Sequence, residues 1–297
     1  MRQIVAGSLV ACAAALVIAA CGGSGVSPSP NPGGGGVPPP PVTNTAPQIK
    51  SVTASDTRVE TGTPITVTAV VEDAETPVAN LTYTWTADTG TFSGTGPVVT
   101  WVAGADAKTP GDFVLTLTVT ERYTSGSLTI ENKTISNTTV HVNNSPKELA
   151  ELSLRFLGDF ATSSVSPEKC VSEFSDSCRG KKDEFEDITD NRHDFLILSS
   201  NLKHTSLQIA ASRTAATVHT ACAFTSRVIT TSPQSGGCRA DPASCKFGAI
   251  QNADGDCWTT NVYERGRWWI CESHYTGKNA VTAFERAFFG IRHLEIP

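Results

Sequence analysis

Proton-transfer chemistry in this chain of 297 residues would depend on a small number of histidines, because it has only six. Glu272 and His274 lie two residues apart near the C-terminal end, and His219, His193 and Asp194 lie upstream of them. A carboxylate beside an imidazole can pass a proton to or from a substrate when both groups reach one cavity. The same side chains serve equally well as ordinary polar groups at the surface, which is the favoured interpretation. Glu272, His274 and His219 are the candidates for catalysis, with no complete catalytic set around them.

Two segments near the C-terminal end, 257–264 and 267–275, alternate in polarity and flank Arg265-Gly266. This pattern predicts two antiparallel strands joined by a two-residue turn. One face of the second strand would then carry Trp268, Ile270, Glu272 and His274. Opposite these would lie Tyr263, Asn261, Thr259 and Cys257. We expect a ligand pocket lined by Tyr263, Trp268 and Ile270, and inward-facing aromatic side chains would bring Glu272 and His274 with them.

Seven of the nine cysteines lie in the second half of the chain, and an oxidising compartment would pair them as disulfides. The short separations favour Cys170 with Cys178 and Cys238 with Cys245. In the register above, Cys257 and Cys271 project from opposite faces and cannot bond to each other. Cys222 would bond one of these two and leave the other thiol free. Cys271 is the expected partner. No Cys-x-x-Cys pair typical of zinc is present, so we expect no metal and no other cofactor.

The first 21 residues have the features of an export signal: Arg2 is positive and residues 4–19 form an apolar run too short to cross a bilayer comfortably. The run ends in Ile18-Ala19-Ala20-Cys21, which resembles the bacterial lipobox. This resemblance implies cleavage before Cys21 and acylation of its thiol, with palmitate among the chains, and such chains anchor a protein stably. Gly22 follows the cysteine, which by resemblance to enterobacterial sorting favours the outer membrane of the cell envelope.

Residues 22–46 are rich in Gly and Pro and cannot bury enough apolar surface to fold, so they read as a disordered linker. Residues 47–143 contain short alternating runs rich in Val and Thr, separated by turn residues. Such runs are typical of an antiparallel sandwich of roughly seven strands. Within them, Glu72, Asp73 and Glu75 are interpreted as a solvated turn in preference to a calcium site.

The 47–143 segment resembles the PKD and related immunoglobulin-like repeats of bacterial proteins. The resemblance lies in four short pieces: Val71-Glu72-Asp73, Tyr83-Thr84-Trp85, Gly96 leading to Trp101, and Gly111-Asp112-Phe113. It implies a module that spaces, displays or binds and does not catalyse.

From Ser145 the hydrophobic period changes to that of a helix. Ser145 has the position of an N-cap, Pro146 that of the first helical residue and Glu148 that of the closing residue of a capping box. Apolar residues follow at helical spacing: Leu149, Leu152, Phe156 and Phe160. We expect two further helices, one beginning at Ser166 and one over residues 181–195.

Strands are expected next, at 207–209 and 215–229, followed by a long loop over 231–256 and the C-terminal hairpin. A final helical segment is expected around the apolar residues Val281, Phe284, Phe288 and Phe289. Helices followed by an antiparallel sheet make residues 145–297 an α+β domain.

This order of elements resembles the NTF2-like (SnoaL-like) superfamily, as do the hairpins LQIAASRTAATVHTACAF and DCWTTNVYERGRWWICESHY. The resemblance implies a cone in which helices pack on a curved antiparallel sheet around a pocket. The expected fold class is therefore an all-β immunoglobulin-like sandwich followed by an α+β NTF2-like cone. Isomerases, dehydratases, hydrolases and many non-catalytic proteins share that superfamily, so the resemblance leaves the function open.

The net charge of −6 and the lack of a basic stripe argue against nucleic acid as a partner. The favoured hypothesis is a non-catalytic, lipid-anchored envelope protein whose cone binds a small apolar ligand or an envelope protein, and whose sheet offers a surface for a homodimer. The alternatives are an envelope enzyme with acid/base chemistry in the cone and a purely structural or adhesive surface protein. The volume of the cone separates them.

Overall fold

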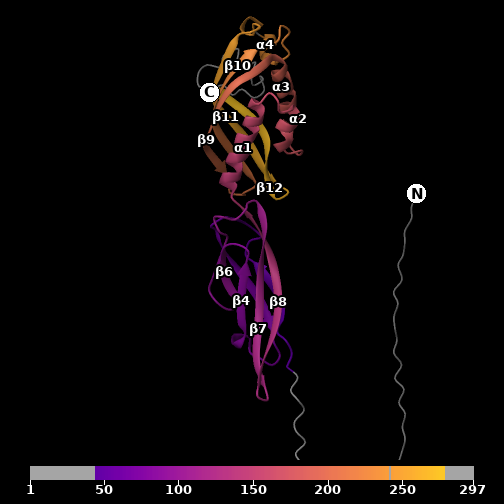
Figure 1. The fold of residues 1–297 in the computed structure, drawn as a ribbon, viewed down its shortest axis with the longest axis vertical. Helices are drawn as coiled ribbons and strands as arrows, with labels where there is room; N and C mark the ends of the chain where they lie inside the picture. Colours follow the sequence, from indigo (N-terminus) through magenta and orange to yellow (C-terminus); the bar gives the residue numbers. More distant parts are fainter. Residues whose placement is uncertain (1–43, 241, 278–297) are drawn as a thin grey trace, which may run out of the picture. The chain divides into compact units, whose positions relative to one another are not determined.

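The structure is a computed structural model that describes residues 44–240 and 242–277, shown in Figure 1. The predicted signal peptide, Cys21, nearly all of the linker and the predicted C-terminal helical segment lie outside the described residues, so acylation of Cys21 stays a prediction. No helix in the described part of the chain is both long and apolar enough to span a membrane.

Residues 44–143, the N-terminal lobe, form two four-stranded sheets. One is antiparallel, in the order β1 (Gln48–Ala54), β3 (Pro64–Glu72), β6 (Val98–Val102), β5 (Thr91–Ser93). The other is mixed, in the order β2 (Arg58–Glu60), β8 (Leu128–Asn143), β7 (Gly111–Ser125), β4 (Thr82–Ala87), and β2 runs parallel to β8. A single turn, η1 (Val78–Asn80), precedes β4. Side chains from both sheets share one core around the fully buried Trp101, so the sheets pack face to face.

Residues 145–277, the C-terminal lobe, begin with helices and end with a four-stranded antiparallel sheet. The helices are α1 (Ser145–Ala161), α2 (Pro167–Cys170) and α3 (Gly180–Asp194), with α4 (Gly236–Ala240) between the strands. Single turns η2 (Val171–Glu173) and η3 (Pro242–Ser244) follow α2 and α4. The sheet has the order β12 (Arg267–Gly277), β11 (Ile250–Glu264), β10 (Ala215–Val228), β9 (Phe195–Ile209).

The predicted fold class, an immunoglobulin-like sandwich followed by a cone with helices packed on a curved sheet, is wrong. The described residues are mostly β, with 52% strand and 20% helix, in three antiparallel or mixed sheets, and few helices occur among them. Segments expected to be loops are strands: β9 begins at Phe195 and β11 at Ile250. Both segments pair along the length of β10, and such long-range pairing overrides weak local signals.

The N-cap of the first helix is one residue earlier than predicted. Asn144 is the N-cap: its side chain accepts a hydrogen bond from the Lys147 N–H at 3.3 Å, and Glu148 accepts one from the Asn144 N–H at 2.7 Å. Ser145 is thereby released from capping. Its hydroxyl donates to Glu60 at 2.7 Å and accepts from Trp268 Nε1 at 2.8 Å, so it connects β2, α1 and β12.

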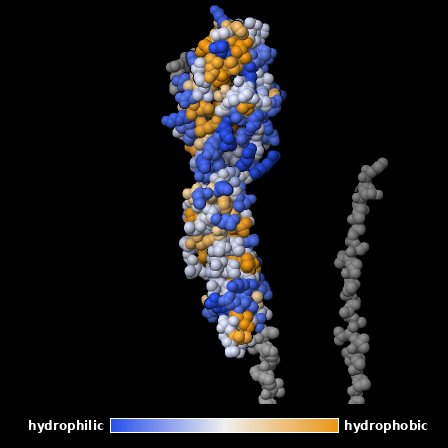
Figure 2. Space-filling view, in the orientation of Figure 1, coloured by the Kyte–Doolittle hydropathy of each residue, from blue (hydrophilic) through white to orange (hydrophobic). Residues whose placement is uncertain are grey.

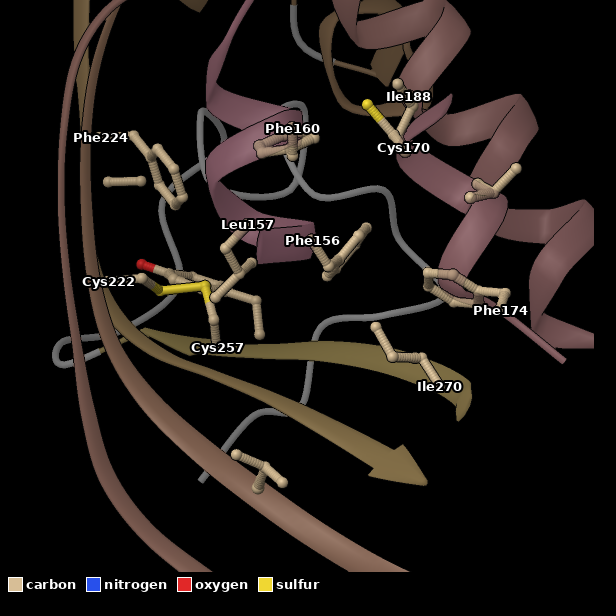
Figure 3. Close-up of a cluster of buried hydrophobic side chains, with 14 of the residues drawn as sticks. Phe156, Leu157, Phe160, Cys170, Phe174, Ile188, Cys222, Phe224, Cys257 and Ile270 are labelled. Carbon is tan, nitrogen blue, oxygen red and sulfur yellow. A yellow bond between two sulfur atoms is a disulfide. The ribbon is translucent and has the colours of Figure 1, made fainter. Parts of the chain in front are cut away.

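The core of the C-terminal lobe is filled by large side chains, as Figure 3 shows. Phe156 of α1 lies edge-on to Phe174, with ring centroids 5.1 Å apart, and Phe160 lies edge-on to Phe224 at 5.7 Å. Ile270 of β12 is fully buried in the same cluster. This packing sets the inner face of the sheet and leaves its other face outward.

Candidate functional site

A β-bulge in β12 decides which side chains of the sheet face the core. Ile270 lies opposite Asn261, but Glu272 lies opposite Thr260, so Cys271 is an extra residue in β12. An extra residue moves the following side chains to the other face. Glu272 and His274 therefore lie on the outer face, away from the buried Ile270.

Two contacts hold this bulge against the start of α3. Cys271 is disulfide-bonded to Cys178, two residues before Gly180. A Cβ atom on Gly180 would lie 2.3 Å from the Cys271 carbonyl oxygen, so only glycine permits the helix to approach so closely. The bulge is thus fixed by residues far away in the sequence.

The outer face carries a row of three stacked rings, which we call the His–Trp–His row: His219 on β10, Trp258 on β11 and His274 on β12. His219 pairs across the strands with Trp258, and Trp258 pairs with His274. The ring centroids are 6.0 Å and 4.0 Å apart, with interplanar angles of 27° and 18°. An imidazole therefore stacks on each side of the indole, which holds all three rings in place.

Each imidazole of this row has a carboxylate beside it. Asp256 Oδ2 lies 2.6 Å from His219 Nδ1, and Glu272 Oε2 lies 3.4 Å from His274 Nε2. A carboxylate at Nδ1 orients the ring and leaves Nε2 of His219 as its other hydrogen-bonding nitrogen. His219 and Asp256 are each 38% exposed, so water weakens the electrostatic effect of this pair.

An open concavity of about 440 Å³ adjoins His219 on the outer face. Its other lining residues are small or polar: Thr205, Ser206, Ala221, Gly255, Asp256, Thr276 and Gly277. The hydroxyl groups, the carboxylate and the imidazole offer both donors and acceptors. This arrangement can hydrogen-bond a polar partner.

The residues predicted to line a ligand pocket pack together: Tyr263 lies edge-on to Trp268, with ring centroids 5.3 Å apart, and Trp268 and Ile270 belong to the core of the C-terminal lobe. Trp268 and Ile270 are buried and packed, and the residues described around the interior enclose a cavity of only about 30 Å³ between α1, α3 and the sheet. Tyr263 lies at the contact between the lobes, with the Arg58 guanidinium over its ring.

Glu184 of α3 is an inward-facing carboxylate that sequence reasoning missed. It is 7% exposed, lines the small cavity and accepts a hydrogen bond from Ser273. The acidic residues of α3 resemble a solvated helix face, which hid it. The sequence does not reveal the bulge in β12, and it is this bulge that turns Ser273 inward, toward Glu184, in place of Glu272.

The expected disulfide between Cys238 and Cys245 is confirmed, and the other pairings differ from those expected. The bonded pairs are Cys178–Cys271, Cys222–Cys257 and Cys238–Cys245. The expected bonds of Cys170 with Cys178 and of Cys222 with Cys271 do not form. Cys222 and Cys257 both point into the core from neighbouring strands, whereas Cys271 sits in the bulge beside α3.

Cys170 is the unpaired cysteine of the described residues and is fully buried. Burial raises the pKa of its thiol, although Arg192 Nη2 lies only 3.2 Å from its sulfur. A buried thiol with a raised pKa is a poor nucleophile, so Cys170 has a packing role.

The acidic turn of the N-terminal lobe is held by internal hydrogen bonds. Asp73 Oδ1 accepts from the N–H groups of Glu75 at 3.0 Å and Thr76 at 2.6 Å, and Glu72 pairs with Lys50 at 3.1 Å. Across the parts of the chain that the structure describes, no three His, Cys, Asp or Glu side chains are grouped to hold a metal ion.

No protein-family model and no curated protein matches the chain. Among solved structures it is similar to the intermembrane space region of the chloroplast protein ARC6, with 14% identity, 42% of this chain and 95% of that chain covered, and a TM-score of 0.30. It is also similar to a protein of unknown function from Mycobacterium tuberculosis, with 13% identity, coverage of 46% and 73%, and a TM-score of 0.31.

A third similar structure is a putative scytalone dehydratase from Novosphingobium aromaticivorans, with 12% identity, coverage of 46% of this chain and 85% of that chain, and a TM-score of 0.33. Structural neighbours therefore include scytalone dehydratase-like (NTF2-like) proteins at low identity and over part of the chain. At these identities and TM-scores the likeness assigns neither a family nor a function.

Proposed function

We propose that the chain is a lipid-anchored protein of a bacterial cell envelope that binds an envelope protein through the outer face of its C-terminal sheet and does not catalyse a reaction. The observation that supports this most is the filled interior of the C-terminal lobe. Pockets for small ligands have volumes of roughly 300–1,000 Å³. The interior cavity of about 30 Å³ is far smaller, which argues against an apolar ligand held inside.

The positions of the candidate catalytic residues support the same proposal. Glu272 is 50% exposed on the outer face, and His274 stacks on Trp258 there. Acid/base chemistry in an enclosed site would need this pair inside, where water is excluded. On an outer face the same groups serve recognition, for which aromatic side chains and hydrogen-bonding groups are well suited.

Contacts between the lobes hold the C-terminal sheet, and with it this outer face, against the N-terminal lobe. Arg58 donates to the Arg213 carbonyl at 2.6 Å, and Arg213 in turn pairs with Asp56 at 2.8 Å. A surface presented on a pre-organised body loses less entropy on binding than one on a loose tether.

A photo-crosslinking amino acid placed at Ala221, in the concavity, tests the partner surface in the cells that make the protein. The matched control carries it at Ile135, which is 65% exposed on the N-terminal lobe. We expect a discrete protein adduct from position 221 that disappears in the His219→Ala and Trp258→Ala backgrounds. Equal adducts from both positions, or adducts insensitive to both substitutions, would overturn the proposed surface.

The lipid anchor is tested separately with a clickable palmitate analogue fed to cells. We expect the full chain to be labelled and its Cys21→Ser variant not to be. A labelled Cys21→Ser variant, or an unlabelled parent protein with its signal intact, would refute the anchor.

A further inference from the structure

One end of the outer face is apolar and basic, in contrast to the polar His–Trp–His row. Four exposed apolar side chains lie there: Leu198 at 44%, Ile229 at 42%, Phe247 at 67% and Ile250 at 49% exposure. Arg227 and Lys246 are exposed among them. We call these six residues the apolar–basic patch. Figure 2 shows orange surface around a blue spot at the end of the C-terminal lobe where Figure 1 labels α4.

Strand pairing brings these residues together. Arg227 lies directly opposite Ile250, and Leu198 lies in a β-bulge of β9 beside the same stretch of β10. The Gly248 N–H donates to the Val228 carbonyl at 2.8 Å, which places Phe247 close to Ile229. The patch therefore spans three neighbouring strands at one end of the sheet.

The loop that carries Lys246 and Phe247 is tied to the body of the lobe. Cys238 and Cys245 are disulfide-bonded, and the buried Asp194 carboxylate accepts hydrogen bonds from the N–H groups of Gln234 at 2.9 Å and Ser235 at 2.8 Å. The exposed phenyl ring is thus presented on a restrained loop, so little entropy is lost when it is buried.

The charges of the apolar–basic patch indicate which kind of partner it binds. Between residues 227 and 250 the chain has three basic residues and one acidic residue, although the whole chain carries a net charge of −6. Arg227 and Lys246 form no ion pair with any residue described in the structure. Exposed apolar side chains flanked by unpaired cations fit a surface with anionic headgroups above an acyl region.

We infer that the apolar–basic patch is a membrane-contact surface that binds anionic lipid headgroups through Arg227 and Lys246 and inserts Phe247 and Ile250 at the acyl boundary. This inference rests on the proposed envelope location. It adds a second, reversible membrane contact to the acyl anchor, because a few basic and apolar side chains bind weakly where acyl chains anchor stably.

The test uses a chain that begins at Gly22, which keeps every described residue and lacks both the signal and the acylated cysteine. Its partition onto vesicles of phosphatidylglycerol and phosphatidylcholine in equal parts is compared with that onto phosphatidylcholine alone, by co-sedimentation at low and high salt. We expect binding only to the anionic vesicles, and weaker binding at high salt because screening reduces the attraction.

Substitutions locate the binding surface. We expect Arg227→Gln and Lys246→Gln each to weaken partition by about fivefold, and Phe247→Glu by about tenfold or more, with Phe247→Leu retaining most binding. Leu128→Glu is the matched control, because Leu128 has the same 67% exposure on the β7–β8 hairpin. Thermal unfolding of each variant checks that it is folded.

Equal binding to both vesicle types, or a Leu128→Glu variant impaired as much as Phe247→Glu, would overturn this inference. Because the chain that begins at Gly22 has no Cys21, its vesicle binding is independent of acylation. Failure of palmitate labelling would therefore refute the anchor alone, and failure of vesicle binding would refute the patch alone.

Discussion

The guanidinium carbon of Arg58 lies 3.3 Å from the ring centroid of Tyr263, and this stacked pair joins the N-terminal lobe to the C-terminal lobe. The Tyr263 hydroxyl donates to Asn143 Oδ1 at 2.9 Å, and Arg58 Nε donates to the same oxygen at 3.0 Å. A planar guanidinium suits this position because it stacks on a ring and donates sideways at once.

Replacement of Arg58 should loosen the contact between the lobes. We expect Arg58→Ala to lower the free energy of unfolding by about 2–3 kcal/mol, since a cation–π contact and hydrogen bonds from a charged group are lost together. Arg58→Lys should recover only part of this, because an ammonium cannot stack in the same way. Urea unfolding measures both. The control Lys50→Ala, whose partner Glu72 is 67% exposed, should cost at most about 1 kcal/mol; equal losses would contradict the assignment.

The Cys178–Cys271 bond should contribute more to stability than the Cys238–Cys245 bond. Its sequence separation is 93 residues, against 7 for the other. In the chain-entropy model a longer closed loop restricts the unfolded state more, and native disulfides are worth about 2–5 kcal/mol. Double serine variants of each pair, unfolded in urea, should show the larger loss for the first pair. The reverse order would indicate that the bulge is held by other contacts.

Two glycines in helices should respond to alanine with opposite signs. Gly180→Ala places a Cβ against the Cys271 carbonyl and should destabilise the protein by about 1–3 kcal/mol. Gly158 of α1 has open space around its Cβ position, so Gly158→Ala should stabilise by up to about 1 kcal/mol through helix propensity. Thermal unfolding of the two variants tests the close approach of α3 to β12, and a Gly180→Ala protein as stable as its parent would exclude it.

Asp194 should make stability depend on acid pH. Burial acts to raise the pKa of this carboxyl, but hydrogen bonds from the His193 ring and from the backbone N–H groups of Gln234 and Ser235 outweigh burial and hold the pKa below its usual range. The unfolded chain has the higher pKa, about 3.9. The stabilisation is therefore present above about pH 4 and lost as the pH falls through the folded-state pKa.

The Asp194→Asn variant should accordingly be less stable than its parent at pH 7, and the difference should shrink as the pH is lowered below about 4. Urea midpoints measured at several pH values give this comparison. Asp88→Asn, at an exposed position of the N-terminal lobe, is the control and should track the parent at every pH. If the difference in stability between Asp194→Asn and its parent is the same at every pH, the charge of the Asp194 carboxylate does not contribute to stability.

Cys170 should be unreactive until the protein unfolds. Burial raises the pKa of the thiol and blocks access to reagents. In the chain that begins at Gly22, we expect iodoacetamide at pH 8 to leave the native protein unmodified and to add one label after unfolding in guanidinium without a reductant. Mass spectrometry counts the labels, and fast labelling of the native protein would place the thiol at the surface.

Local pattern was sufficient where neighbouring residues determine the structure. The helix at Ser145 was predicted from Pro146, Glu148 and its apolar spacing, although its N-cap is Asn144. The turn at Arg265-Gly266 forms with positive φ angles of 52° and 77°. Over the first four pairs from that turn the register follows directly, so Tyr263 faces Trp268 and Asn261 faces Ile270. A two-residue turn allows no other start to the pairing.

Only the tertiary structure decided the face of Glu272 and His274. One extra residue at Cys271 reverses their orientation, and that bulge depends on Cys178 and Gly180, which meet it from far away in the chain. The same long-range contacts set the disulfide partners and the lengths of β9 and β11. Alternation of polarity predicts which residues share a face only while the register has no bulge. Here the bulge is stabilised by packing against a helix that is distant in the sequence, and no local pattern contains that energy.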